Sequence, residues 1–302
     1  MYKHQGITWI DLESPTRDEV LHIIYEYNLS ANLTDELNNP TLRSKVDTYD
    51  NIAYIVLHFP RFSKKPKTLG GDLEVDFVIG EKFLITTHYD SSDRLRRFIT
   101  QFETKTGFGD KIGSDHAAHL FATIIEHMYR GTINELEGIN GTLQEIEQNI
   151  FDHNDQGRMV ATISHTNRKL LDVKRALRFH DDILRSLEAV SRGIFPPHAT
   201  HRIGILLGEY NKVNLVVDGF RDILRDLRDT NDSLLSYKTN ETMKTLTAIT
   251  VIMLPLTLVA GIFGMNMPWP LIGSTDDLWI VVGAMALSGI IIYTYFKLKR
   301  WL

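Results

Sequence analysis

The sequence predicts an α+β domain, an α/β sandwich, followed by long stalk helices and a C-terminal hairpin of two transmembrane helices. Three observations support this fold class. Apolar runs rich in β-branched residues mix with helical signals up to about residue 110, residues 111–240 are helical in pattern, and two uncharged apolar segments lie near the end of the chain. We therefore expect domains at residues 1–110, 111–240 and 241–302.

Strands are expected in the first domain. Residues 7–12 and 52–59 are apolar and rich in β-branched or aromatic side chains, which favours strands. Residues 75–79 and 83–87 have the same character and flank the turn Gly80-Glu81-Lys82, so we expect a β-hairpin there.

Helices follow the first strand and dominate after residue 114. Ser14 can cap a helix that has Pro15 at its first position. Two long helices are expected at residues 115–152 and 156–192, with a break between them.

A third long helix is expected after Pro197, because apolar residues recur there at alternating three- and four-residue steps. This pattern is typical of a coiled coil, whose apolar stripe requires partner helices. A helix that continued from residue 200 to 263 would span about 100 Å at ~1.5 Å per residue and would need lateral support from the two preceding helices or from sister subunits. The repeating residues are Ile203, Leu206, Tyr210, Val213, Val217, Phe220, Leu224 and Leu227.

Two segments, at about 245–264 and 278–296, are uncharged and have about the ~20 residues that a helix needs to cross a bilayer. A loop at 265–277 joins them. Basic residues flank the pair on its outer ends, whereas the loop carries only Asp276 and Asp277, so the positive-inside rule places both termini in the cytoplasm and the loop outside. Residues 1–6 are polar and no apolar region follows, so we expect no signal peptide and a multi-pass protein of the cell (inner or plasma) membrane.

Composition excludes several classes of function. The chain has no cysteine, which rules out thiolate zinc sites and cysteine nucleophiles. The residues after Lys244 hold three of the 33 basic and two of the 38 acidic residues, so the rest of the chain carries a net charge of −6, which argues against nucleic acid as a partner. Phosphate-cradling glycine loops and grouped catalytic side chains are also missing from the sequence, so we expect neither ATP-driven transport nor an enzyme.

One stripe of the first transmembrane segment carries small and hydroxyl-bearing side chains at three- and four-residue steps. It consists of Thr247, Thr250, Leu254, Thr257 and Gly261. Such a stripe is suited to close helix packing in lipid, and it is equally suited to lining a pore. The spacing alone leaves both interpretations open.

The residues Gly264-Met265-Asn266 end the first transmembrane segment, just before the loop. With this motif at this place, with the closing run Lys297 to Leu302, and with the stretches 39–46, 74–77 and 83–88, the sequence resembles the CorA family of divalent-cation channels over nearly its whole length.

The resemblance implies a funnel-shaped homopentamer in the lipid bilayer, with Gly264, Met265 and Asn266 as selectivity filter. It implies an acidic ring at the inner mouth, formed by Asp229. Aligned on the Gly-Met-Asn motif, the family's other pore-facing positions fall on Asn240, Met243, Leu246, Thr250, Leu254, Thr257 and Gly261.

The expected function is passive import of hydrated Mg²⁺, with Co²⁺ or Ni²⁺ also passing, driven by the membrane potential. No cofactor is expected, and the divalent cation is both the transported ion and a candidate cytoplasmic regulator. Two alternatives stay open: a zinc transporter like the ZntB branch, with or without proton coupling, and a membrane-anchored scaffold whose hairpin only anchors it.

The sequence departs from the family pattern at several points. The loop segment Met267-Pro268-Trp269-Pro270-Leu271 lacks the glutamate that many members have, which leaves Asp276 and Asp277 either to attract cations or to cap the second helix. The family's stalk aspartate falls on Ile205, so its regulatory metal site does not transfer and stays unknown. Two histidine pairs, His116 with His119 and His198 with His201, are incomplete zinc sites.

Overall fold

The structure is a computed structural model, which describes residues 1–4, 6–41, 43–62, 72–89, 93–103, 116–151, 156–265 and 275–299. The described chain divides into two compact units, Met1–Leu227 and Arg228–Leu302. The expected boundaries near residues 110 and 240 stay predictions.

A six-stranded mixed sheet forms the centre of the first unit, in the order β1-β2-β6-β5-β4-β3. Strands β2 and β6 are parallel, and the other neighbours are antiparallel. The expected strands at 7–12 and 52–59 and the hairpin around Gly80 are confirmed. The strands are β1 (Tyr2–His4), β2 (Ile7–Glu13), β3 (Lys45–Tyr49), β4 (Ile52–Phe59), β5 (Leu73–Ile79) and β6 (Phe83–His88).

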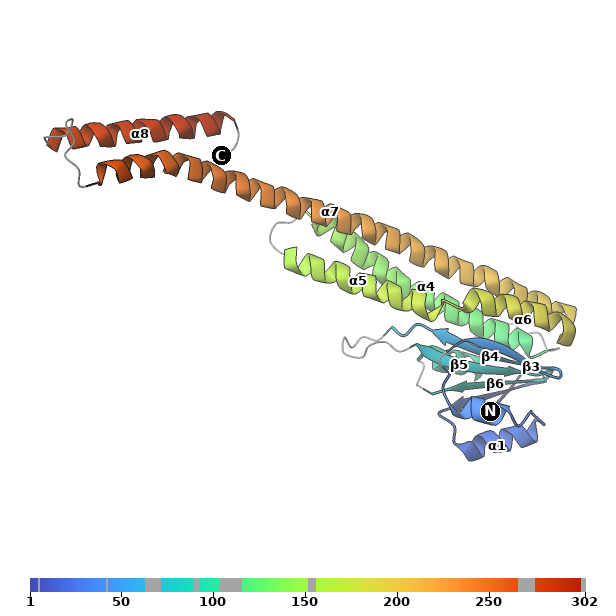
Figure 1. Cartoon of the computed structure of the whole chain (residues 1–302). Helices are drawn as coiled ribbons and strands as arrows, with labels where there is room; N and C mark the ends of the chain where they lie inside the picture. The colour runs from blue at the N-terminus through green and yellow to red at the C-terminus, as the bar shows by residue number, and fades with distance from the viewer. Residues whose placement is uncertain are drawn as a thin grey trace. The chain divides into compact units, whose positions relative to one another are not determined.

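Alternation along the strands gives the sheet two buried faces, as a sandwich requires. On β4, Ile55 and Leu57 pack in a large core under the long helices, whereas Tyr54 and Val56 point to a smaller core on the other face. Helices α1 (Arg17–Glu26) and α2 (Leu33–Asn38) cover the smaller core. In Figure 1, α1 lies on one side of the sheet and α4 to α6 lie on the other.

The cap of α1 differs from the expected one. Thr16, not Ser14, is the N-cap: its hydroxyl accepts from the Glu19 amide, and the Glu19 carboxylate accepts from the Thr16 amide at 2.8 Å. Ser14 takes a left-handed backbone conformation with φ of 50°, and its hydroxyl donates to the Tyr89 carbonyl at 2.9 Å. Ser14 therefore ties the end of β2 to the chain after β6.

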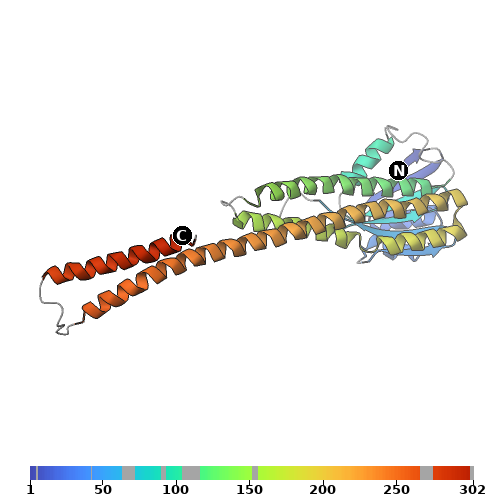
Figure 2. The ribbon, with the colours of Figure 1, turned by 90° about the horizontal axis from the view of Figure 1, so that it is seen from above.

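Five helices pack on the larger core, and Figure 2 shows α4 beside the first part of α7. The repeating apolar residues predicted for a coiled coil face this core, so the lateral support for this part of α7 comes from its own chain. The helices are α3 (Asp93–Glu103), α4 (Ala118–Asn149), α5 (Gln156–Ala176), α6 (His180–Ile194) and α7 (Pro197–Phe263).

The helix expected over 156–192 is two helices, because the chain turns between Ala176 and His180. Two backbone hydrogen bonds that each span three residues close this turn. The Arg178 amide donates to the Arg175 carbonyl, and the His180 amide donates to the Leu177 carbonyl. Residues 176–180 contain no proline or glycine, so the sequence pattern does not predict a break there. Tertiary contacts of His180 position the turn.

The imidazole of His180 is fully buried between the sheet and α4. Its Nε2 lies 2.8 Å from the backbone oxygen of His58, which only accepts, so Nε2 carries the hydrogen. Its Nδ1 therefore accepts from the Tyr129 hydroxyl at 2.7 Å. Burial lowers the pKa of His180 to about 4, so the imidazole is neutral at pH 7.

The second unit contains the last part of α7 and helix α8 (Thr275–Leu298). Both helices are long and apolar enough to cross a membrane, and few residues of their apolar windows are buried. The less exposed residues of α8 recur at helical spacing along one face and end at the buried Phe296. They are Val281, Met285, Ser288, Gly289, Ile292 and Phe296.

Aromatic side chains mark the two ends of α8. Trp279 lies near its start, while Tyr293 and Tyr295 lie near its end, and all three are exposed. Tryptophan and tyrosine are enriched at both interfaces of a bilayer, because an apolar ring with a polar group suits that boundary. Their places near the two ends of the helix are therefore typical of a transmembrane helix.

Candidate functional site

The candidate site is the stripe of α7 that the sequence assigns to the pore. Every described member is exposed in the single chain, and so is Asp229 at the predicted inner mouth. At roughly 100° per residue these positions share one face of the helix. The stripe consists of Asn240, Met243, Leu246, Thr250, Leu254, Thr257 and Gly261.

The opposite face of α7 packs on α8. Ala248 is fully buried there, and Ile252, Pro255 and Val259 are half-buried on the same side. A Cβ added at Gly289 of α8 would lie 3.8 Å from the Leu256 side chain, so the two helices approach closely at this level. The pore stripe therefore points away from α8, and α8 leaves it uncovered.

Two threonines of the stripe, Thr250 and Thr257, use their hydroxyl hydrogens within α7. Thr250 donates to the Leu246 carbonyl and Thr257 donates to the Met253 carbonyl, each at 2.9 Å. A hydroxyl has one donor and two acceptor lone pairs, so the oxygens keep acceptor capacity on the exposed face. They can accept hydrogen bonds from water molecules around a cation.

The stripe residues after 244 include no charged side chain. Before that point, Lys238 and Lys244 point more than a quarter turn of the helix away from the direction midway between Met243 and Leu246. Met243 and Leu246 are each more than half exposed and form an apolar band at this level. A site of this kind can hold an ion's water shell but offers no anionic ligand to replace it.

Helix α7 ends directly before the predicted filter. The Gly264 amide donates to the Ala260 carbonyl at 2.9 Å, and the Met265 amide donates to the Ile262 carbonyl at 3.3 Å. A Cβ on Gly264 would lie 3.0 Å from the Ala260 carbonyl oxygen, so glycine allows this tight ending. Met265 is exposed, whereas Asn266 lies outside the described residues.

The secondary candidate positions stay unassigned. Asp276 and Asp277 lie in the first turn of α8, where capping and cation attraction are both possible, and their side chains are not among those described. Within the described part of the chain, no group of three or more His, Asp or Glu side chains could hold a metal ion. A regulatory metal site therefore stays unknown.

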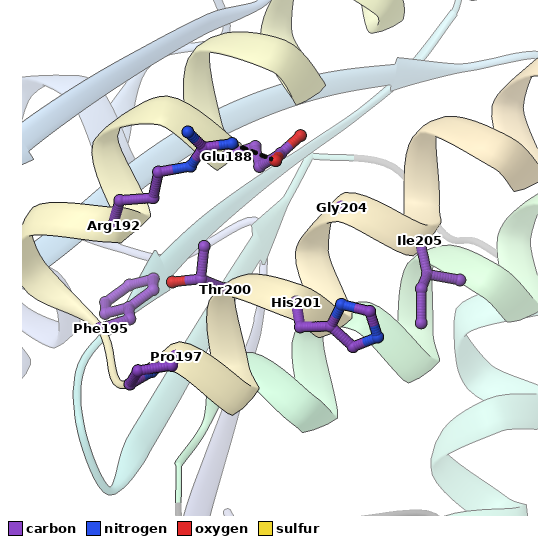
Figure 3. Close-up of a pocket in the computed structure, with 8 residues that line it drawn as sticks. All are labelled: Glu188, Arg192, Phe195, Pro197, Thr200, His201, Gly204 and Ile205. Atoms are coloured by element: carbon purple, nitrogen blue, oxygen red, sulfur yellow. Dashed lines mark hydrogen bonds and ion pairs between the residues drawn. The ribbon is translucent and has the colours of Figure 1, made fainter.

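The four histidines of the predicted pairs meet differently from their sequence spacing. The rings of His119 and His198 stack across α4 and α7, with centroids 5.4 Å apart. His116 packs on Phe195 at 4.5 Å, and its Nδ1 accepts from the Ala118 amide. His201 lines a separate pocket, which Figure 3 shows between α6 and α7 above Pro197.

The chain matches the family model described as "CorA-like Mg2+ transporter protein" over residues 4–300. It is 25% identical to the cobalt/magnesium transport protein CorA of Thermotoga maritima, over 98% of this chain and 83% of the relative. It is 24% identical to the magnesium transport protein CorA of Campylobacter jejuni, over 99% of this chain and 92% of the relative.

Solved structures show the same fold. The complete structure of the CorA magnesium transporter from Methanocaldococcus jannaschii matches with a TM-score of 0.82 at 20% identity, over 100% of this chain and 93% of the other. The ZntB cytoplasmic domain from Vibrio parahaemolyticus matches with a TM-score of 0.60 at 16% identity, over 76% of this chain and 88% of the other.

A transporter family model matches nearly the whole chain, which also has two helices long and apolar enough to cross a membrane, so the protein is an integral membrane transport protein and not an enzyme. The chain belongs to the CorA-like Mg2+ transporter family, whose model covers nearly all of it. It is therefore a membrane transporter for divalent cations, and the predicted family and fold class are confirmed.

Proposed function

We propose that this chain is one subunit of a homopentameric channel that lets hydrated divalent cations, chiefly Mg²⁺, flow passively into the cytoplasm. The observation that carries the proposal is the exposed stripe from Asn240 to Gly261, which lies opposite the α8-packed face of α7. Two helices cannot enclose a channel, whereas a ring of copies buries the stripe around an axis.

The chemistry of the stripe favours a hydrated ion. Mg²⁺ releases its water reluctantly and keeps several waters when it binds proteins. The stripe offers the hydroxyl oxygens of Thr250 and Thr257 and the amide of Asn240, all of which suit hydrogen bonds to coordinated water. In the proposed ring, Asn266 supplies one amide oxygen per subunit at the outer end, where the ion's size and charge are selected.

The membrane potential is sufficient to drive this import. Moving a charge across 100 mV is worth ~2.3 kcal/mol, which gives about 4.6 kcal/mol for a divalent cation. This free energy corresponds to more than three orders of magnitude in accumulation. In the proposed orientation both termini lie in the cytoplasm, because Lys297 and Lys299 follow the second span.

Flux measured ion by ion tests the proposal. Purified protein is reconstituted into vesicles, and uptake of Mg²⁺, Co²⁺, Ni²⁺ and Zn²⁺ is followed at a set membrane potential, with and without a pH gradient. We expect Mg²⁺ uptake that follows the potential and ignores the pH gradient. Zinc uptake that requires the gradient would favour a ZntB-like transporter, and vesicles that pass no ion would favour a membrane-anchored scaffold.

Leu246→Ser is expected to raise basal cation flux. Leu246 is 56% exposed on the stripe, next to Met243, and in a ring of copies such side chains form an apolar constriction that excludes water. Serine in every copy admits water at this level and lowers the barrier to ion passage. The measurement is the rate of cation leak in vesicles with a high internal Mg²⁺ concentration.

The matched control for this prediction is Ile249→Ser. Ile249 is 50% exposed on the same helix, close to the level of Leu246, but lies about a third of a turn from the middle of the stripe. A constriction at Leu246 predicts a larger leak for Leu246→Ser than for Ile249→Ser. Parental flux in the Leu246 variant would place the gate elsewhere.

A further inference from the structure

Two carboxylates lie next to each other inside the first unit, on the sheet face that α1 and α2 cover. Glu74 and Asp76 are two residues apart on β5, so their side chains leave the same face of the strand. Val78 continues this row and packs in the smaller core. Asp76 is fully buried and Glu74 is 8% exposed.

The carboxylate of Glu74 is well supplied with donors. Its Oε1 accepts from the Thr41 amide at 2.7 Å and from the Thr41 hydroxyl at 3.0 Å. Its Oε2 lies 3.6 Å from Nε2 of His58, the residue directly across on β4. Burial opposes the charge on His58, but Glu74 and the Thr41 carbonyl together outweigh it and raise the pKa of His58. These contacts suit an ionised Glu74.

Asp76 has no comparable set of donors. The Tyr54 hydroxyl donates to its Oδ2 at 3.2 Å, but its Oδ1 has no hydrogen-bond partner. Thr87 lies directly opposite Asp76 on β6, and its buried hydroxyl also lacks a partner. Two of the three unpaired buried side-chain oxygens among the described residues are therefore register neighbours. Native structures rarely leave such groups unpaired without a bound species.

The Lys45 side chain on β3 is engaged by carboxylates other than Glu74 and Asp76. The Lys45 ammonium lies 2.6 Å from Glu36 and 3.1 Å from Asp47, at the partly exposed edge of the cluster. An ionised Asp76 would therefore be a buried charge beside a second negative charge. Burial, followed by Glu74, raises the pKa of the Asp76 carboxyl well above its ordinary value. The titratable groups around it are Glu36, Lys45, Asp47, Tyr54, His58, Glu74 and Tyr89.

We propose that Asp76 is a buried proton-binding site, whose carboxyl holds a proton at neutral pH beside the carboxyl group of Glu74. The proton removes a buried charge that no cation offsets and turns one oxygen of the Asp76 carboxyl from an acceptor into a donor. Loss of the proton would place two negative charges on one strand face and weaken the hold of Glu74 on Thr41. The site therefore links protonation to docking of the segment that leads into β3. It concerns the first unit alone and does not depend on the transport mechanism.

Infrared spectroscopy of the full chain in detergent tests this assignment. A protonated carboxyl has a C=O stretching band apart from those of carboxylates and amides. We expect this band at pH 7 in the parent protein, its loss in Asp76→Asn, and its retention in Asp47→Asn, which changes a partly exposed acid of the same cluster. A band that survives in Asp76→Asn but is lost in Glu74→Gln would place the proton on Glu74 and overturn the proposal.

The fold of Asp76→Asn provides a second test, because asparagine resembles a protonated aspartate in shape and charge. We expect its thermal midpoint at pH 7 to match the parent value. Amide hydrogen exchange of the peptide containing Thr41 should be equal in the two proteins at pH 7 and several-fold faster in the parent at alkaline pH. An Asp76→Asn chain that fails to fold would show that the charge itself is required, which contradicts a bound proton.

Discussion

Asn266→Ala is expected to abolish divalent cation flux while leaving the fold and the oligomer intact. Alanine removes the amide oxygen that holds the water shell of the ion, and residues 245–275 contain no charged side chain that could replace it. A hydrogen bond to a charged species is worth about 1.5–3 kcal/mol, and in the proposed pentamer five subunits lose it together. The measurement is Mg²⁺ uptake by reconstituted vesicles, with size-exclusion elution as the control for assembly.

Asn266→Gly separates this role from a structural one. Asparagine is common just after a helix C-terminus, and α7 ends at Phe263, so Asn266 could serve only to end the helix. Glycine is the better residue for that purpose. Near-normal uptake by Asn266→Gly channels would make Asn266 a cap and would leave the filter unidentified.

Lowering the pH is expected to reduce the free energy of unfolding of the first unit by up to about 3 kcal/mol through His180. The folded state keeps His180 neutral because its pKa is lowered to about 4, whereas an unfolded chain binds the proton near the ordinary value of 6.5. The unfolded state thus holds more protons between these values. Stability present above pH 6.5 is lost as the pH falls toward 4.

His180→Gln should remove much of this acid sensitivity. Glutamine can still donate to the His58 carbonyl, but it does not titrate. Denaturant unfolding at pH 7 and pH 5 measures the effect, and the difference between the two pH values should shrink in the variant. His22→Gln, at an exposed position of α1, is the matched control and should keep the parental difference. Equal acid sensitivity in all three proteins would contradict a buried neutral His180.

The elements that sequence patterns predicted best are those with strong local signals. The β5–β6 hairpin has a short turn and β-branched strands, and the transmembrane segments have length and lack charge. The short elements β1, α2 and β3 were not predicted, because three to six residues carry little periodicity. The turn before His180 was missed because buried bonds to the sheet and to α4 position it.

The candidate site was predictable in part for a physical reason. Three- and four-residue spacing places residues such as Thr250 and Thr257 on one helix face whatever the tertiary fold, so the stripe could be read from the sequence. Which face meets α8 depends on packing around Ala248, and no local pattern encodes it. In the sequence, Glu74 and Asp76 were noted only as part of a stretch that resembles the family. Their surroundings come from four strands and α2, which no local pattern encodes.

The intrahelical bonds of Thr250 and Thr257 have a consequence for ions of the opposite sign. Because each hydroxyl hydrogen is directed at a carbonyl of its own helix, the exposed oxygens present only lone pairs. A chloride ion needs donors to replace its hydration, and at these two levels of the proposed channel it would find none. In the proposed pore, the direction of these two hydroxyl dipoles would therefore disfavour anions relative to hydrated cations, without any carboxylate at these levels.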